Sequence, residues 1–233
     1  GVNMFPLALL NASSPPVDPA LTLVLLHFDT DYTDSSQTAA VWSNSGSGQS
    51  ISATSKFGAG SLATLGTGGI YTQNATVRTP LGSDNWTIEG WFNKTAIGND
   101  INGLFMFMEG AGQPITLYIE NGILCAAVRF DASTRTTISH QTTIVAGEFT
   151  HYALVRNGAT ITLYLNGVAG TTTINSGALS LYPSFFTYCF ISLARKVEGS
   201  TTTYLDGLHD EFRYRREAVY TTNFTPPTAP FTF

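Results

Sequence analysis

Hydrophobic and polar residues alternate along most of the chain, and this pattern predicts strands. The clearest alternation sets Ile161, Leu163 and Leu165 against Thr160, Thr162 and Tyr164. A period of two places alternate side chains on opposite faces of a sheet, one buried and one wetter. Further strands are expected at 21–28, 86–93, 103–108, 115–120 and 123–130. The pattern leaves room for one short helical turn, at 216–220, and otherwise predicts antiparallel sheets.

The segment 86–93 is the strongest of these strands. Trp86, Ile88 and Phe92 share one face, and Trp91 lies on the other. A strand that is apolar on both faces is expected near the centre of a sheet, covered on both sides. We therefore expect both tryptophans of this strand to be core residues.

Three Asn-Gly pairs mark hairpins, at 121–122, 157–158 and 166–167. A type I′ turn needs positive φ at both central residues, which Asn and Gly tolerate best. The pairs therefore join consecutive antiparallel strands. The Pro-rich first 20 residues predict an extended arm, residues 21–233 a single β-sandwich domain, and the prolines after residue 225 an extended tail.

Composition supports an all-β, two-sheet antiparallel sandwich. Charged residues make up 12% of the 233, whereas about 25% is usual, and polarity comes instead from Thr, Ser, Asn and 22 Gly. The net charge of −5 argues against a nucleic-acid partner. No apolar run approaches the roughly 18 residues of a membrane helix, so membrane insertion is not expected. Cys125 and Cys189 could form a disulfide only if their strands are neighbours.

Four sequence blocks follow one another along the chain: Leu25-Leu-His-Phe-Asp-Thr30, Trp86-Thr-Ile-Glu-Gly-Trp-Phe92, Phe149-Thr-His-Tyr-Ala-Leu-Val-Arg156 and Asp206-Gly-Leu-His-Asp-Glu-Phe-Arg213. Together they resemble the concanavalin A-like, laminin G-like jelly-roll family over residues 21–231. The ending Tyr220-Thr-Thr-Asn-Phe-Thr-Pro-Pro227 looks most like the version in bacteriophage structural and tail proteins. This resemblance implies two curved sheets and a non-catalytic binding or adhesive role.

The resemblance also implies that some members bind Ca²⁺ near the sheet ends. Asp29 and Asp210 lie in the matching first and last strand blocks, and carboxylate oxygens suit this ion. The alternative is that Asp29 caps its own loop and that Asp210 or Glu211 pairs with a nearby arginine. A hydrolase is not expected, because Asp206 and Asp210 would lie about 13 Å apart along a strand, too far for a retaining pair.

Aromatic residues outside the strongest strands are candidates for a ligand surface, since sugar-binding faces use rings that stack on pyranose CH groups. They are Trp42, Tyr71, Tyr182, Phe185 and Phe186. The alternative is that each ring fills a strand end of the core.

The sequence thus predicts a non-enzymatic module on a virion surface, capsid or tail, which binds other virion proteins, copies of itself as a homo-oligomer, or glycans. A secreted or cell-surface carbohydrate-binding lectin module is the alternative.

Overall fold

A computed structural model describes residues 18–77, 83–109, 112–130, 135–175, 189–198 and 200–233 of the chain. Nearly all of the predicted arm lies outside these residues. Its last part forms a 3₁₀ turn, Pro19–Leu21, which Asp18 caps by accepting a hydrogen bond from the Ala20 amide. The described residues contain no helix that is long and apolar enough to span a membrane.

Strands make up almost all of the regular structure. Those before residue 110 are β1 (Thr22–Leu26), β2 (Ser43–Gly46), β3 (Ser50–Ser52), β4 (Ser61–Leu65), β5 (Gly68–Thr72), β6 (Trp86–Lys94) and β7 (Ile101–Glu109). The middle ones are β8 (Gly112–Glu120), β9 (Ile123–Arg129), β10 (Arg135–Thr143), β11 (Thr150–Asn157), β12 (Thr160–Leu165) and β13 (Val168–Asn175). The last are β14 (Cys189–Leu193), β15 (Arg195–Glu198), β16 (Thr201–Tyr204) and β17 (Asp206–Arg215).

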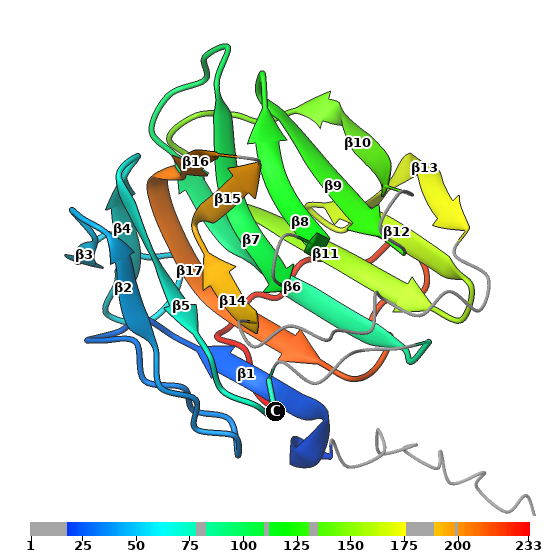
Figure 1. Ribbon diagram of the computed structural model, residues 1–233, viewed down its shortest axis with the longest axis horizontal. Coiled ribbons are helices and arrows are strands. Elements are labelled where there is room, and N and C mark those ends of the chain that lie inside the picture. The colour runs from blue at the N-terminus through cyan, green and yellow to red at the C-terminus, as the bar shows by residue number, and fades with distance from the viewer. Residues whose placement is uncertain (1–17, 78–82, 110–111, 131–134, 176–188, 199) are drawn as a thin grey trace, which may run out of the picture.

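The strands form two antiparallel sheets that pack face to face (Figure 1). Sheet A has the order β13-β12-β11-β6-β17-β4-β3, with β1 also paired to β17, and sheet B has the order β10-β9-β8-β7-β14-β5-β2. A small hairpin, β15-β16, contacts β7 of sheet B. The all-β sandwich expected from the sequence is confirmed.

The strand β6 confirms the predicted central strand. It lies between β11 and β17, and all but one of its side chains are buried. Trp86 faces the core between the sheets, whereas Trp91 belongs to a separate cluster on the other face of sheet A. Both tryptophans are therefore buried, as the pattern predicted.

The three predicted hairpins are present, joining β8 to β9, β11 to β12 and β12 to β13. At 121–122 and 166–167 both residues have positive φ, as a type I′ turn requires. The third turn differs. Asn157 pairs with Thr160, so Gly158 and Ala159 are the turn residues, and of these two Gly158 alone has positive φ. Positive φ at the first central residue is the pattern of a type II′ turn.

One expectation is wrong, and one question that the sequence left open is answered. The predicted helical turn at 216–220 forms bends and irregular chain, because this segment is held against sheet A through the Thr87 side chain. A disulfide is excluded because Cys125 lies on β9 and Cys189 on β14, with β8 and β7 between them. Three strand spacings amount to about 14 Å, twice the largest Cα separation that a disulfide spans. Cys125 is a free thiol.

A histidine lies deep in the core between the sheets. His209 is fully buried beside Phe28 and Phe212, and its Nε2 lies 2.8 Å from the Tyr152 hydroxyl. Burial lowers the pKa of His209 to about 3. The neutral ring is therefore part of the native core at all ordinary pH values.

The C-terminal tail, residues 216–233, forms neither strand nor helix and crosses the outer face of sheet A (Figure 1). The Phe224 amide donates to the Gly167 carbonyl, and Asn223 accepts from the Ala169 amide. The Tyr220 ring stacks on Phe224. The tail thus covers a face of the sheet that would otherwise meet water.

Beneath the tail lies a buried ion pair between neighbouring strands. Glu89 of β6 and Arg213 of β17 are direct cross-strand partners, and the Arg213 Nη2 lies 2.6 Å from a Glu89 carboxylate oxygen. The other oxygen accepts from Tyr220 at 2.8 Å and from the ring of His151 at 3.3 Å. Burial alone raises the pKa of Glu89, but Arg213 and His151 outweigh it and hold that pKa below its usual value.

We expect Glu89→Gln to lower the free energy of unfolding by about 3–5 kcal/mol, because it leaves a buried arginine without a counter-charge. Glu217→Gln is the matched control. It also removes an arginine partner, but its side chain is 41% exposed, and we expect a loss below about 1 kcal/mol. Denaturant titration at neutral pH measures both. Equal losses would contradict the central role of Glu89.

The buried His209 predicts a stability that falls in acid. The unfolded chain takes up a proton near the ordinary pKa of 6.5, whereas the folded chain does so only near 3. Stability from this group is therefore lost as pH falls below 6.5, by about 2 kcal/mol at pH 5. We expect His209→Gln to reduce the difference in unfolding free energy between pH 7.5 and pH 5 by about that amount. An unchanged difference would show that His209 does not titrate in this way.

Candidate functional site in a groove at the sandwich rim

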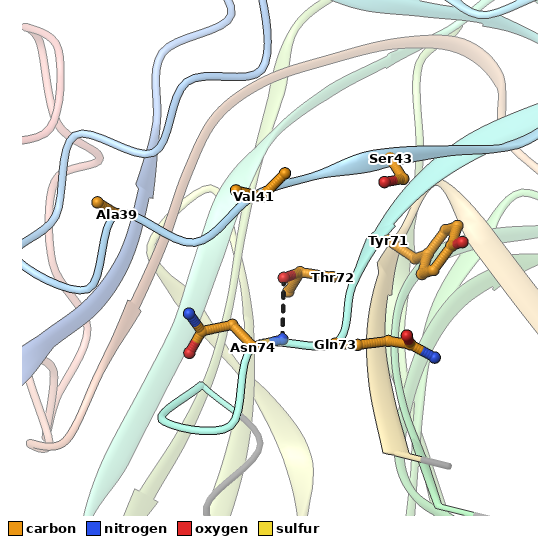
Figure 2. A pocket seen from close by; sticks show the side chains of 7 residues that line it. All are labelled: Ala39, Val41, Ser43, Tyr71, Thr72, Gln73 and Asn74. Carbon is orange, nitrogen blue, oxygen red and sulfur yellow. Dashed lines mark hydrogen bonds between the residues drawn. The ribbon is translucent and has the colours of Figure 1, made fainter.

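A hollow opens where two strands of sheet B separate. The edge strand β2 pairs with β5 from Gly46 opposite Gly68 to Ser43 opposite Tyr71. Beyond that point the two chains diverge, and a hollow of about 320 Å³ lies between residues 39–43 and residues 71–74 (Figure 2). The hollow is thus produced by the end of a strand pairing.

A second hollow, of about 370 Å³, lies beside the loop that connects β1 to β2. Its described lining consists of residues 31–34 and 39–42. Ala39 and Val41 line both hollows, so the two adjoin. We refer to the two hollows together as the rim groove. Its combined size lies in the range of small-molecule sites in proteins.

The buried carboxylate of Asp34 gives the β1–β2 loop its shape. It accepts hydrogen bonds from the backbone amides of Leu25, Ser36 and Ala40 at 2.9–3.0 Å. The Ser36 hydroxyl in turn donates to the Leu23 carbonyl of β1. Because these bonds tie the loop to a core strand, the wall of the rim groove is fixed rather than free to collapse.

Two features of this wall are costly for the folded protein. Ala39 has φ of 46°, in the left-handed region, which costs about 1–2 kcal/mol for a residue with a Cβ. Val41 exposes 80% of its surface to solvent, more than any other large hydrophobic residue described. Strain of this kind occurs preferentially at functional sites. Both residues lie where the two hollows meet.

The groove offers the groups that recognise a polar ring. Along the end of β5, Tyr71 and Gln73 lie on one side of the strand, and Thr72 and Asn74 on the other (Figure 2). Gln73 is exposed, and Tyr71 is half-buried. Trp42 lines the second hollow, and its buried indole N–H has no acceptor among the described residues. An aromatic ring and amides therefore line the first hollow, and an indole donor lines the adjoining one.

Two of the five predicted ligand-surface residues are brought together here. Tyr71 lines the first hollow and Trp42 the second. Trp42 is 8% exposed and packs in the core, which was the alternative role, and its part in a ligand surface stays a prediction. Tyr182, Phe185 and Phe186 lie outside the described residues. Val41 and Gln73 were not predicted from the sequence, although an apolar residue after the polar loop 29–37 was a signal for Val41.

The two candidate calcium ligands contact the same loop. Asp29 accepts a hydrogen bond from the Ala59 amide. Asp210, which is fully buried, accepts from the amides of Lys56 and Phe57 at 2.6 and 3.2 Å. Neither predicted arginine pairing forms, since Arg213 binds Glu89 and Arg215 binds Glu217. Both carboxylates therefore anchor the loop between β3 and β4.

Glu211, beside them, holds two other segments. Its carboxylate lies 2.9 Å from the His27 Nδ1 and accepts from the Phe231 amide of the tail at 2.8 Å. The hydrogen bond that His27 donates to Glu211 raises the pKa of His27. Burial raises the pKa of Asp210 to about 7. In the described residues no three His, Cys, Asp or Glu side chains are grouped in a way that would hold a metal.

Comparison with known families agrees with this architecture. A laminin G model, described as the concanavalin A-like lectin/glucanases superfamily, matches residues 64–220, well over half of the chain. The chain belongs to the concanavalin A-like lectin/glucanase superfamily. The match covers the strands from β5 to β17, including both residues of the Glu89–Arg213 pair. No curated protein matches this superfamily member significantly by sequence.

Solved structures with the same fold include clostridial toxin binding domains. The binding domain of Paraclostridial Mosquitocidal Protein 1 has a TM-score of 0.67 at 15% identity, covering 87% of this chain and 50% of that one. The binding domain of botulinum neurotoxin DC, in complex with rat synaptotagmin II, has a TM-score of 0.64 at 12% identity, covering 87% and 49%. This superfamily member thus spans about half the length of the structures it matches. At such identities the likeness shows the shared concanavalin A-like fold.

Calcium binding at Asp29 and Asp210 stays a prediction. An ion bound only by the folded domain adds stability that grows with its concentration, about 2.7 kcal/mol at one hundred times the dissociation constant. We therefore expect a calcium-binding domain to melt several degrees higher in millimolar CaCl₂ than in EDTA, and Asp29→Asn to remove the difference. Equal melting temperatures would leave both residues with the loop-anchoring role alone.

Proposed function

We propose that the domain is a non-catalytic carbohydrate-binding module and that its ligand lies in the rim groove. The observation that carries the proposal is the position of Tyr71 and Gln73 in one hollow and of Trp42 in the adjoining hollow, on a lectin fold. Rings stack on the CH faces of sugars, and amides exchange hydrogen bonds with sugar hydroxyls. The groove is shallow, and its lining mixes polar side chains with apolar and aromatic ones, which suits a ligand that offers both hydroxyls and CH faces.

Structural neighbours support a binding role. One matched structure concerns botulinum neurotoxin type C, whose cell entry depends on interaction with two ganglioside molecules, and another holds a botulinum neurotoxin DC binding domain in complex with SialylT. These facts belong to the toxins. They favour a binding module over a glucanase, and the carboxylates near β17 favour it too, because Asp210 and Glu211 are buried and engaged with backbone amides.

The rigidity of the groove fits this role. Asp34 fixes the β1–β2 loop before any ligand arrives, so the entropy cost of ordering that loop on binding is small.

The bacteriophage origin and the virion location expected from the sequence stay predictions, and so does the homo-oligomer. Mass spectrometry of purified particles checks the origin and the location. A glycan-binding adhesion module is compatible with either a virion or a secreted protein.

The location of the site is tested by a matched pair of variants. Val41→Lys places a long side chain at the junction of the two hollows, and we expect it to weaken glycan binding at least about tenfold, or about 1.4 kcal/mol. Val145→Lys makes the same change at a valine that is 56% exposed outside the groove, and we expect affinity to stay within about twofold. A glycan array followed by calorimetric titration of the best hit measures both.

The outcomes separate clearly. Absence of any reproducible glycan signal from the wild-type domain would overturn the proposed function. Equal losses in the two lysine variants, or none in either, would place the glycan elsewhere on the domain. Melting temperatures of the two variants are compared first, so that a folding defect is not read as lost binding.

A further inference from the structure

The charged groups of the rim groove are of one sign. Its described lining includes two carboxylates, Asp31 and Asp34, and none of the described lining residues is Lys, Arg or His. The two acids differ in what they can do. Asp34 is 5% exposed and its oxygens accept from three backbone amides, so it belongs to the scaffold. Asp31 is exposed in the wall of the second hollow.

Asp31 is held as a charged group with a fixed position. Its carboxylate accepts a hydrogen bond from the Thr33 amide at 2.8 Å. Bonds from the Thr33 side chain and amide lower the pKa of Asp31 below its usual value. The group is therefore an anion at neutral pH and in mild acid. An ionised carboxylate has about four lone-pair sites, so the two bonds from Thr33 leave capacity to accept from a ligand hydroxyl.

We propose that Asp31 makes the rim groove selective for uncharged glycans and against acidic ones. This inference rests on the proposed function, and it names the ligand class of that same site. A neutral sugar offers hydroxyl donors, which a carboxylate accepts in charge-assisted hydrogen bonds. A sialic acid carboxylate or a sulfate ester in the same place offers no such donor at its charged end, and it meets a like charge.

The expected size of the discrimination follows from Coulomb's law. Two like charges about 6 Å apart at a wet protein surface repel enough to weaken binding about fivefold to tenfold. Because Asp31 is open to solvent, the effective dielectric constant is closer to that of water than to that of the protein interior. The repulsion energy therefore lies toward the weak end of its range. Salt reduces this repulsion, since the screening length is about 10 Å at 0.1 M ionic strength. A purely steric rejection of acidic sugars would not respond to salt.

The test uses glycans that share one core and carry either no charged substituent or an acidic one, and the salt dependence separates the effect of charge from that of size. Lactose and N-acetyllactosamine are immobilised in uncharged, sialylated and sulfated forms on one array together with a broad panel of neutral glycans. The best neutral hit and its acidic counterparts are then titrated in solution at low and high salt. We expect the neutral form to bind about fivefold to tenfold more tightly at low salt, and this ratio to shrink at high salt.

The decisive variant is Asp31→Asn, which removes the charge and keeps an oxygen that accepts from Thr33. We expect it to bring the ratio of neutral to acidic affinity below about twofold at low salt. Asp18→Asn is the matched control, because Asp18 is also exposed and accepts from the amide two residues later, outside the groove. We expect it to leave the ratio unchanged.

Each result has a distinct meaning. If acidic forms bind as tightly as the neutral form or more tightly, the charge selectivity is overturned while glycan binding stands. The same holds if the ratio of neutral to acidic affinity does not depend on salt and is unchanged in Asp31→Asn. If the wild-type domain binds no glycan of any charge, the proposed function fails and the selectivity fails with it. A narrowed ratio in Asp31→Asn, with the control unchanged, supports the inference.

Discussion

The buried ion pair between Glu89 and Arg213 is the interaction on which the rest of sheet A depends. It joins the two central strands β6 and β17 at directly opposed positions. A charge pair is stable away from water only when its remaining hydrogen-bonding capacity is met. The tail supplies this through the Tyr220 hydroxyl and the Thr232 carbonyl, which accepts from Arg213. The irregular tail is therefore as much a part of the sandwich as any strand.

Buried carboxylates organise the loops at the end of the sandwich in the same way. Asp34 folds the β1–β2 loop, Asp210 holds the amides of Lys56 and Phe57, and Glu211 holds the tail at Phe231. In each case a carboxylate accepts hydrogen bonds from backbone amides that have no strand partner. The buried N–H groups are therefore satisfied. The few charged residues of the chain therefore have mainly structural roles at this end of the sandwich. Several acids are structural, and Asp31 is left at the surface of the groove.

Local chemistry made much of the fold predictable from the sequence. Asn121-Gly122 and Asn166-Gly167 specify turns within four residues, and the apolar period along β6 and β12 specifies faces without reference to distant segments. The groove was not predictable, because it arises where β2 leaves β5, and that pairing joins residues 28 positions apart at Ser43 and Tyr71. The expected helix at 216–220 failed for the same reason, since contacts with Thr87 override local preference.

The central place of β17 in sheet A affects the order in which the strands of that sheet can pair during synthesis. This strand pairs with β6 on one side and with both β4 and β1 on the other, yet it is the last strand in the sequence. During synthesis, β1 and β4 emerge long before the partner that joins them to β6. Their unpaired backbone edges stay open to wrong pairing until β17 is made, about 140 residues after β4 and about 180 after β1. Assembly of sheet A is therefore expected to be late and concerted, once β17 has been made.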